Sequence, residues 1–249
     1  MSEASLQIFQ ITPDLLELEE TRRIILTGPT ELYWTTDWSP DFYIQLAKQG
    51  FITTAILLGE EPSFPVLLPE IQRSYAILDW KNRRMSRSMK RWMASEDFGN
   101  QEYRLSLYHE LKPILDGIHQ IHGPNCWVIP SYQKLLQTLI QETWDNFEII
   151  PVGLVNSEGQ LIAGEIGYRI GNTYTSLTGF HDRSERVHNH AGKLQLHLLA
   201  QHFEKQGLEF WNLGHPGMQY KTDMGAMNTQ RDKFLKRWEV SAVNKSKKH

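Results

Sequence analysis

The sequence is almost free of cysteine, with Cys126 as its one thiol. A single cysteine excludes an internal disulfide, and no Cys or His partner stands near it at zinc-binding spacing, so we expect no metal site. Long apolar runs are also missing, because stretches such as residues 55–58 fall far short of the roughly 18 residues that cross a bilayer. The start, Met1-Ser-Glu-Ala, shows no signal-peptide pattern. We therefore expect a cytoplasmic protein that does not insert into a membrane.

A strong net charge is missing as well. The chain carries 26 Lys and Arg against 29 Asp and Glu, a formal net charge of -3, so a nucleic-acid partner would need a local basic patch. One such patch spans residues 81–91, where six cations stand in eleven residues without an acid. These cations are Lys81, Arg83, Arg84, Arg87, Lys90 and Arg91. By composition this basic segment is either a solvated cationic surface or a phosphate-binding one.

The first half of the chain contains one clear helix signal. Ser39 suits the N-cap, Pro40 suits the first helical position and Gly50 suits the stop, which together predict a short helix. The other elements expected here are strands over residues 52–58 and 74–80, separated by a proline-containing turn, and a helix over about residues 101–121.

The second half begins after a loop that starts at His122, where we place a domain boundary. The elements expected beyond it are a helix from Pro130, strands over residues 147–155, 160–170 and 173–178, a helix over 191–206 ending at Gly207, and a strand over 208–213. Three antiparallel strands, a helix and a fourth strand follow the order of the acetyltransferase-like (GNAT) core. We therefore predict an α/β (α+β) fold, with a smaller N-terminal α/β domain over residues 1–121 and a GNAT-like domain over residues 122–249.

Three segments of the sequence form an ordered pattern. Asp37-x-Ser-Pro precedes Gly50-Phe51, and Ser86-Arg-Ser-Met-Lys-Arg-Trp lies in and after the basic segment. The third segment runs from Trp127 to about Leu235 and contains a helix opened by that tryptophan, the three strands, the long helix and Gly225-Ala226 before Arg231-Asp-x-Phe-Leu. Together they resemble the leucyl/phenylalanyl-tRNA-protein transferase family, and the second segment is the most specific match. The matches keep the order of that family across about 200 residues.

The resemblance implies an activity and its partners. Members of this family move an amino acid from charged tRNA to the N-terminal amine of a protein, which marks that protein for degradation as an N-degron. The implied partners are an aminoacyl-tRNA and an acceptor protein or peptide N-terminus. No cofactor is implied, because an activated ester reacts with an amine once both are oriented and a proton path exists. The basic segment is implied to hold tRNA phosphates.

Three aromatic residues match substrate-binding positions of the family. Trp127 matches a tryptophan that stacks on the terminal adenine of the tRNA, an interaction worth roughly 1–3 kcal/mol. Tyr174 and Phe203 match aromatic residues that line the pocket for the amino-acid side chain. Core packing explains the same three residues equally well, since the chain contains eight tryptophans and many other aromatic residues.

Other positions depart from the family. An Asp that orients and deprotonates the attacking amine corresponds to Asn212, and a Gln two residues further on corresponds to Gly214. An amide cannot act as a base at neutral pH. A glutamate on the third strand of the family's core corresponds to Leu177. The sequence therefore keeps Asn212 as a catalytic candidate but does not support Leu/Phe specificity.

Two polar residues are new relative to the family. Glu165 stands where the family has a methionine at the edge of the side-chain pocket, and a carboxylate there would select a cationic or polar amino acid, unless it pairs with Arg169 on the same strand face. The run His215-Pro-Gly-Met-Gln-Tyr-Lys resembles one in arginyl-tRNA-protein transferases, which also points to arginine transfer. His215 is our candidate base, because an unperturbed histidine titrates near 6.5. The alternative is a structural loop histidine.

Two other functions stay open. One is an acyl-CoA-dependent GNAT acetyltransferase, whose pyrophosphate loop uses glycines to expose backbone amides; here Arg186 and Ala191 match only the ends of that loop. The other is a non-catalytic module that binds N-terminal residues or tRNA, with Glu165 as the anchor for a basic terminus. The preferred hypothesis is an aminoacyl-tRNA-protein transferase with Asn212 and His215 at its catalytic centre.

Overall fold

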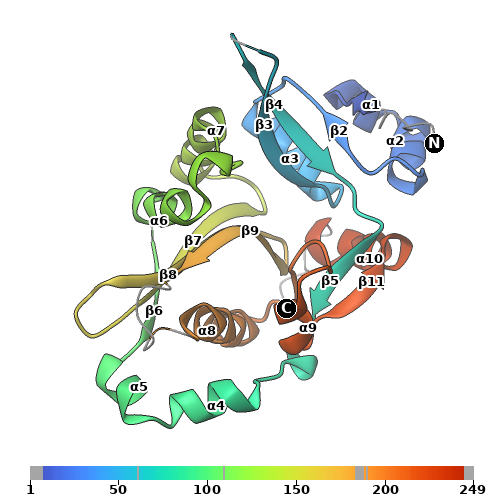
Figure 1. Cartoon of the computed structure of the whole chain (residues 1–249). Helices are drawn as coiled ribbons and strands as arrows, with labels where there is room; N and C mark the ends of the chain where they lie inside the picture. Colours follow the sequence, from blue (N-terminus) through green and yellow to red (C-terminus); the bar gives the residue numbers. More distant parts are fainter. Residues whose placement is uncertain (1–7, 61, 109, 183–187, 189, 244–249) are drawn as a thin grey trace, which may run out of the picture.

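The computed structural model describes residues 8–60, 62–108, 110–182, 188 and 190–243 (Figure 1). Within these residues the largest sheet has seven strands in the order β11-β5-β10-β9-β8-β7-β6. Its meander consists of β7 (Phe147–Val155), β8 (Leu161–Ile170) and β9 (Thr173–His181), and its other strands are β5 (Ser74–Leu78), β6 (Arg104–Leu107), β10 (Phe210–Asn212) and β11 (Met227–Gln230). The mixed α/β class predicted from the sequence is confirmed.

Helices cover both faces of this sheet. α6 (Lys112–His122) and α7 (Pro130–Gln141) pack on one face and α8 (Ala191–Lys205) on the other (Figure 1). Each face has its own cluster of buried apolar side chains. Because side chains alternate along a strand, Phe210 of β10 joins the α6/α7 cluster and its neighbour Trp211 joins the α8 cluster.

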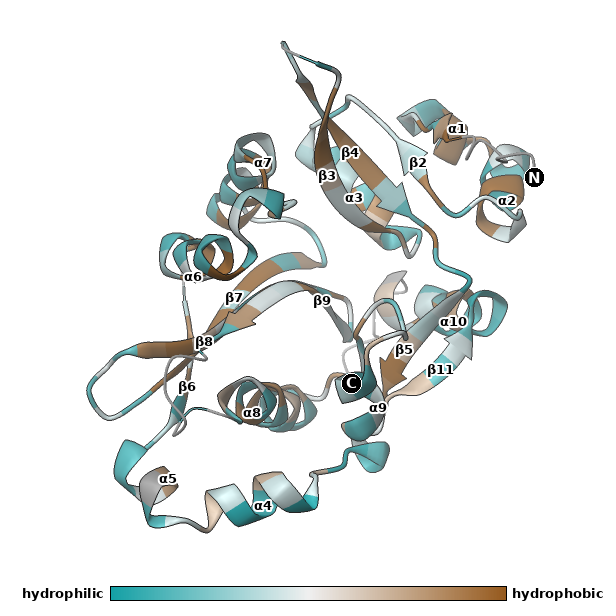
Figure 2. Cartoon of the chain, viewed as in Figure 1, coloured by the Kyte–Doolittle hydropathy of each residue, from teal (hydrophilic) through white to brown (hydrophobic). Residues whose placement is uncertain are grey.

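The N-terminal part of the chain is built around a β-hairpin. β3 (Ile52–Leu58) pairs with β4 (Phe64–Glu70), and α3 (Pro40–Lys48) packs against β3. The predicted cap is confirmed, since the Ser39 hydroxyl accepts a hydrogen bond from the Phe42 amide at 3.4 Å. Much of β3 and β4 is hydrophobic, whereas α10 (Arg231–Trp238) is mostly hydrophilic (Figure 2). The short elements before α3 are β1 (Phe9–Gln10), α1 (Pro13–Glu17), α2 (Glu19–Thr27) and β2 (Tyr33–Trp34).

Arg231 at the start of α10 joins the N-terminal part to the large sheet. Its Nε donates to the Gln72 carbonyl at 2.9 Å, and its two terminal nitrogens donate to the carbonyls of Gly28 and Ile71, each at 2.6 Å. Phe234, one turn further along α10, stacks on Tyr75 of β5 with ring centroids 3.8 Å apart. We call the contacts of Arg231 with these three carbonyls the junction.

The predicted β-β-β-α-β order is confirmed, since β7, β8 and β9 are followed by α8 and then by β10. β10 runs parallel to β9 and pairs with residues 173–175. Beyond that point β9 bulges at Leu177 and runs on along β8 to His181, while β10 ends at Asn212. We call this point of divergence between β9 and β10 the fork.

The proline-containing turn predicted between the first two strands is wrong, because its central residues form β4. Leu67, between the two prolines of this strand, bonds through its amide to the Thr35 carbonyl at 3.0 Å, on the side of β4 away from β3. Pro65 and Pro69 have the same orientation as Leu67, so their missing N–H groups do not interrupt the ladder with β3.

The helical stretch predicted over residues 101–121 is confirmed only in its second half, as α6. α5 (Glu96–Gln101) ends where that helix was to begin, β6 follows, and α6 starts with Pro113 in its first turn. Residues 104–107 are extended because they pair with β7 at the edge of the sheet, a contact between segments distant in sequence. The predicted domain boundary after residue 121 stays a prediction; the large sheet takes β5 and β6 from before that position.

Candidate functional site

A carboxylate is buried beneath α8, at Glu165 of β8, where only 5% of the residue is exposed. Its Oε1 accepts hydrogen bonds from the hydroxyls of Tyr174 at 2.8 Å and Ser176 at 3.1 Å. Ser176 Oγ in turn accepts a hydrogen bond from Trp211 Nε1 at 2.8 Å. Gly167 provides the room, since a Cβ at this position would collide with the Tyr174 hydroxyl. Three strands therefore fix the orientation of the carboxylate.

Aromatic rings line the same place. The ring of Tyr174 lies 4.3 Å from that of Phe203 on α8 and 5.4 Å from that of Trp211 on β10, measured between centroids. Glu165, Tyr174 and Phe203, three of the predicted substrate-binding residues, thus lie together. We call Glu165, Tyr174, Ser176, Phe203 and Trp211 the carboxylate cluster.

The charge of Glu165 is not neutralised by a cation. None of the ion pairs formed by the described residues includes Glu165. Arg169, its alternative partner, donates instead to the Gly171 carbonyl at 3.1 Å, so that pairing is wrong.

Burial raises the pKa of Glu165 to about 7, against the opposing effect of the Tyr174 and Ser176 hydrogen bonds. Burial, and then the charge of Glu165, raise the pKa of Tyr220 to about 12, which places this tyrosine near the cluster.

The two predicted catalytic residues lie at and just beyond the end of β10, beside the fork. Asn212 is 1% exposed, and its Oδ1 accepts a hydrogen bond from the Gly214 amide at 2.9 Å. Its Nδ2 is buried without a partner in the part of the chain that the structure describes. His215 is exposed, and its Nδ1 accepts a hydrogen bond from the Gly217 amide at 3.1 Å. Asn212 therefore offers an unused buried donor, whereas His215 faces solvent.

Lys221 is a candidate that the sequence analysis missed. It lies on α9 (Gln219–Asp223), is 6% exposed, and donates from Nζ to the His215 carbonyl at 2.7 Å. Its Nζ is 5.9 Å from the centroid of the Tyr220 ring. Burial lowers the pKa of Lys221 to about 8. A lysine of this kind can act as a base near neutral pH. The only signal in the sequence was the Tyr-Lys pair that follows His215.

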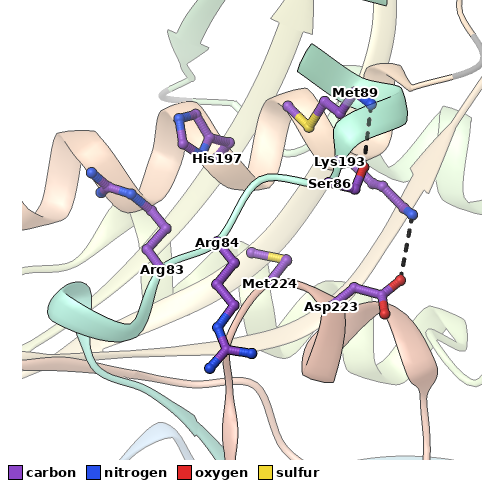
Figure 3. Close-up of a pocket in the computed structure, with 8 residues that line it drawn as sticks. All are labelled: Arg83, Arg84, Ser86, Met89, Lys193, His197, Asp223 and Met224. Atoms are coloured by element: carbon purple, nitrogen blue, oxygen red, sulfur yellow. Dashed lines mark hydrogen bonds and ion pairs between the residues drawn. The ribbon is translucent and has the colours of Figure 1, made fainter. Parts of the chain in front are cut away.

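The basic segment lies against α8 and leads into α4 (Arg87–Met93) (Figure 3). Ser86 caps α4 by accepting the Met89 amide at 3.2 Å, and Met89 is buried, so the apolar residues interleaved with the cations pack inward. Arg83 pairs with Glu204 of α8 at 2.8 Å. The other five cations, Lys81, Arg84, Arg87, Lys90 and Arg91, are exposed. A small pocket between this segment, α8 and α9 is lined by Arg83, Arg84, Ser86, Met89, Lys193, His197, Asp223 and Met224 (Figure 3).

The span that holds these features matches a known family. The family model described as leucyl/phenylalanyl-tRNA protein transferase matches residues 77–239, which is more than half of the chain. The protein belongs to this family. The matched span includes the basic segment from Lys81 onward, the carboxylate cluster, the fork and Lys221.

Two solved structures resemble this family member in fold. One is the C-terminal domain (DUF2156) of a protein described as a lysylphosphatidylglycerol synthetase from Agrobacterium fabrum, 13% identical, with a TM-score of 0.46 over 87% of this chain and 69% of that one. The other is L-PGS from Bacillus licheniformis, 11% identical, with a TM-score of 0.43 over 76% of this chain and 67% of that one. No curated protein matches the chain. Neither structural likeness is close enough to assign an activity.

The predicted site residues of this family member do not all lie together in the structure. Trp127 is half-buried and its ring lies 4.9 Å from that of Tyr132, nearly perpendicular to it. It packs with the α6/α7 cluster, so the sheet separates it from Glu165. Leu177, at the bulge of β9, also packs on the α6/α7 face. The expected grouping of Trp127 with the carboxylate cluster is not seen.

The described residues contain no group of three or more His, Cys, Asp or Glu placed to hold a metal ion. No helix in the described part of the chain combines the length and apolar character needed to cross a membrane. Arg186, which belongs to the alternative acyl-CoA loop, lies outside the described residues.

Proposed function

We propose that the protein transfers an amino acid from charged tRNA to the N-terminal amine of a protein or peptide, and that the reaction takes place at the fork. Family membership supports the reaction type. The observation that carries the location is the buried amine of Lys221, which is held beside the end of β10 by the His215 carbonyl.

The chemistry needs three proton movements. The α-ammonium group of the acceptor loses a proton, and its nitrogen attacks the ester carbonyl to form the C–N bond and then releases a second proton to solvent. The C–O bond to the terminal ribose breaks, and the ribose oxygen takes up a proton. A free α-amine has a pKa of about 7.7–8.0, while burial lowers the pKa of Lys221 to about 8. A proton therefore passes between the two amines at little cost in free energy, whereas an ordinary lysine, with a pKa of about 10.4, would retain it.

These properties give each residue at the fork a role. Neutral Lys221 accepts the proton of the acceptor amine and delivers it to the ribose oxygen. Asn212 Nδ2, a buried donor with no partner among the described residues, stabilises the negative charge that develops on the ester carbonyl oxygen. His215 acts as a positioning residue, because its carbonyl holds Lys221 Nζ and its ring lies in solvent.

The exposed cations of the basic segment supply the contact with tRNA in this proposal. Arg84, Arg87, Lys90 and Arg91 present their charges to solvent and can neutralise phosphates without reading the sequence of the RNA. The adjoining pocket adds Lys193 and His197 from α8 (Figure 3). The phosphate backbone would therefore approach the face of the sheet that α8 covers.

A direct assay tests the proposal. The purified protein is incubated with tRNAs charged with labelled Arg, Lys, Leu or Phe and with peptides that begin with Arg, Lys, Asp or Glu. Transfer of label to the peptide from at least one tRNA is expected, and acetylation of the peptide N-terminus must abolish it. Saturable binding of tRNA or peptide without turnover would contradict catalysis and favour a binding module. Acetyl transfer from acetyl-CoA would instead favour the acetyltransferase alternative.

A further inference from the structure

The carboxylate cluster buries an acidic side chain without a countercharge from the described residues. Burying an ionised carboxylate is costly unless a cation compensates it. Glu165 is 5% exposed, yet no ion pair of the described residues includes it. Its recorded partners are two neutral hydroxyls, Tyr174 and Ser176. A single lysine or arginine side chain could have paired with this carboxylate, but none of the ion pairs of the described residues does so.

The surroundings of Glu165 suit an organic cation. Both hydroxyls donate to Oε1, which leaves the lone pairs of Oε2 for another donor. The ring of Tyr174, which is bonded to the carboxylate through its hydroxyl, lies beside those of Phe203 and Trp211, and aromatic rings attract guanidinium and ammonium groups through their faces. A carboxylate grouped with three aromatic rings has the chemistry to hold a cationic side chain with an aliphatic stem.

We propose that Glu165 binds the cationic side chain of the amino acid carried by the tRNA, so that the protein transfers arginine or lysine in preference to leucine or phenylalanine. This inference rests on the proposed aminoacyl transfer and adds the class of the transferred amino acid. It concerns a specificity-determining residue and leaves the proton transfers at the fork unchanged.

The position of the cluster favours the donor over the acceptor as the source of this side chain. Phe203 lies on α8, and Glu204, the next residue on this helix, pairs with Arg83 of the basic segment. Met89 of α4 packs with Leu194 of α8. The surface proposed for tRNA and the carboxylate cluster therefore lie on the same face of the sheet, the one covered by α8.

Three variants test the inference. Glu165→Gln keeps an oxygen acceptor for Tyr174 and Ser176 but removes the charge. Glu165→Met also makes the site apolar. Glu148→Gln, at an exposed glutamate of β7, is the matched control. For each protein we would measure kcat/KM with tRNAs charged with Arg, Lys, Leu and Phe, each with acceptor peptides that begin with Arg or with Asp.

The expected result is a change in preference rather than a general loss. Glu165→Gln should lower the Arg:Leu ratio of kcat/KM by on the order of 100-fold, because a buried charge pair is lost. Glu165→Met should transfer leucine or phenylalanine better than the wild-type protein does, a gain that misfolding cannot produce. Glu148→Gln should match the wild type. A wild-type preference for leucine, or an unchanged ratio in Glu165→Gln, would overturn the inference.

Two further arms separate the possible failures. If the effect of Glu165→Gln follows the first residue of the acceptor peptide and not the donor, the site binds the acceptor, and the assignment to the donor is overturned. Binding of 3′-deoxy-3′-arginylamino-adenosine and of its leucyl counterpart is measured by calorimetry, without turnover. Preference for the arginyl compound that Glu165→Gln abolishes supports the inference even if no transfer occurs, whereas equal binding of both compounds counts against it. Absence of transfer from every tRNA contradicts the proposed function separately.

Discussion

The junction and the fork differ in how they hydrogen-bond a cation that is partly buried at the junction and buried at the fork. At the junction the guanidinium of Arg231 donates to three backbone carbonyls between 2.6 and 2.9 Å, so its hydrogen-bonding capacity is well used. At the fork Lys221 donates to one carbonyl, and burial lowers its pKa to about 8. A guanidinium group is not deprotonated in proteins, whereas Lys221 can lose its proton. The well-satisfied cation stabilises the fold, and the poorly satisfied one is available for chemistry.

The largest effect is expected for the poorly satisfied cation. Lys221→Arg keeps a positive charge but removes the group that can titrate near neutral pH, so transfer should fall by about 10²–10⁴-fold, the range of general acid–base catalysis. Lys233→Arg, at an exposed position on α10, is the control and should retain full activity. Full activity of Lys221→Arg would show that the amine of Lys221 does not transfer a proton during the reaction.

The protonation of Lys221 can also be observed directly. In the folded protein one lysine amine should titrate with a pKa near 8 in an NMR titration of isotopically labelled lysines, because burial disfavours the charged form. Its neutral fraction, and with it the proposed base, grows as the pH rises through that value. The signal should be absent from Lys221→Arg and present in Lys233→Arg.

Arg231 should show the reverse pattern, with a large effect on stability. Arg231→Lys cannot present the planar set of donors that reaches Gly28, Ile71 and Gln72. Two of these three residues, Ile71 and Gln72, are at most 4% exposed, so their carbonyls lose a partner where water cannot easily replace it. The free energy of unfolding in urea should fall by about 3 kcal/mol, while Arg23→Lys, at an exposed position of α2, should change it by less than about 0.5 kcal/mol.

Glu165 extends the comparison to a buried anion, with an effect on stability that depends on pH. Burial raises its pKa from 4.5 to about 7, so between these values the folded protein holds a proton that the unfolded chain releases. Stability is therefore greatest below pH 4.5 as far as this group is concerned, and falls as the pH rises to 7, by up to about 3 kcal/mol. Glu165→Gln should lack this fall and exceed the wild type in stability at pH 8. Glu148→Gln should keep the wild-type slope in urea unfolding from pH 4.5 to 8.

Local sequence signals account for much of the second half of the fold. Strands with turn residues between them and a long helix that ends at Gly207 gave the β-β-β-α-β order without knowledge of contacts. β4 and β6 were missed because their strand state depends on pairing with distant segments, and Pro65 or a four-residue run gives no local sign of that pairing.

The residues of the candidate site also differ in whether they could be named before the fold was known. Glu165, Tyr174 and Phe203 could be named in advance because each aligns with a position of the family's side-chain pocket, and the structure groups them. Lys221 could not be named in advance. Its lowered pKa results from burial, and its burial depends on the tertiary fold rather than on the local sequence. Trp127 was also named from its match to the family, but it packs on the α6/α7 face of the sheet, and its role in binding tRNA stays a prediction.

The smallest effect is expected for substitutions of the exposed cations in the basic segment. This effect on tRNA binding also distinguishes these cations from Arg83, which is in an ion pair. Lys90→Gln with Arg91→Gln removes two exposed cations of α4, so the slope of log K against log salt concentration for tRNA binding should become shallower by up to about 2, with only a several-fold loss of affinity at physiological salt. Arg83→Gln should change the slope less, because Glu204 already neutralises that charge at 2.8 Å. Filter binding at several salt concentrations measures both. Equal slopes for the double variant and the wild type would remove Lys90 and Arg91 from the tRNA-binding surface and leave Arg84, Arg87 and the pocket residues of α8 as the remaining phosphate contacts.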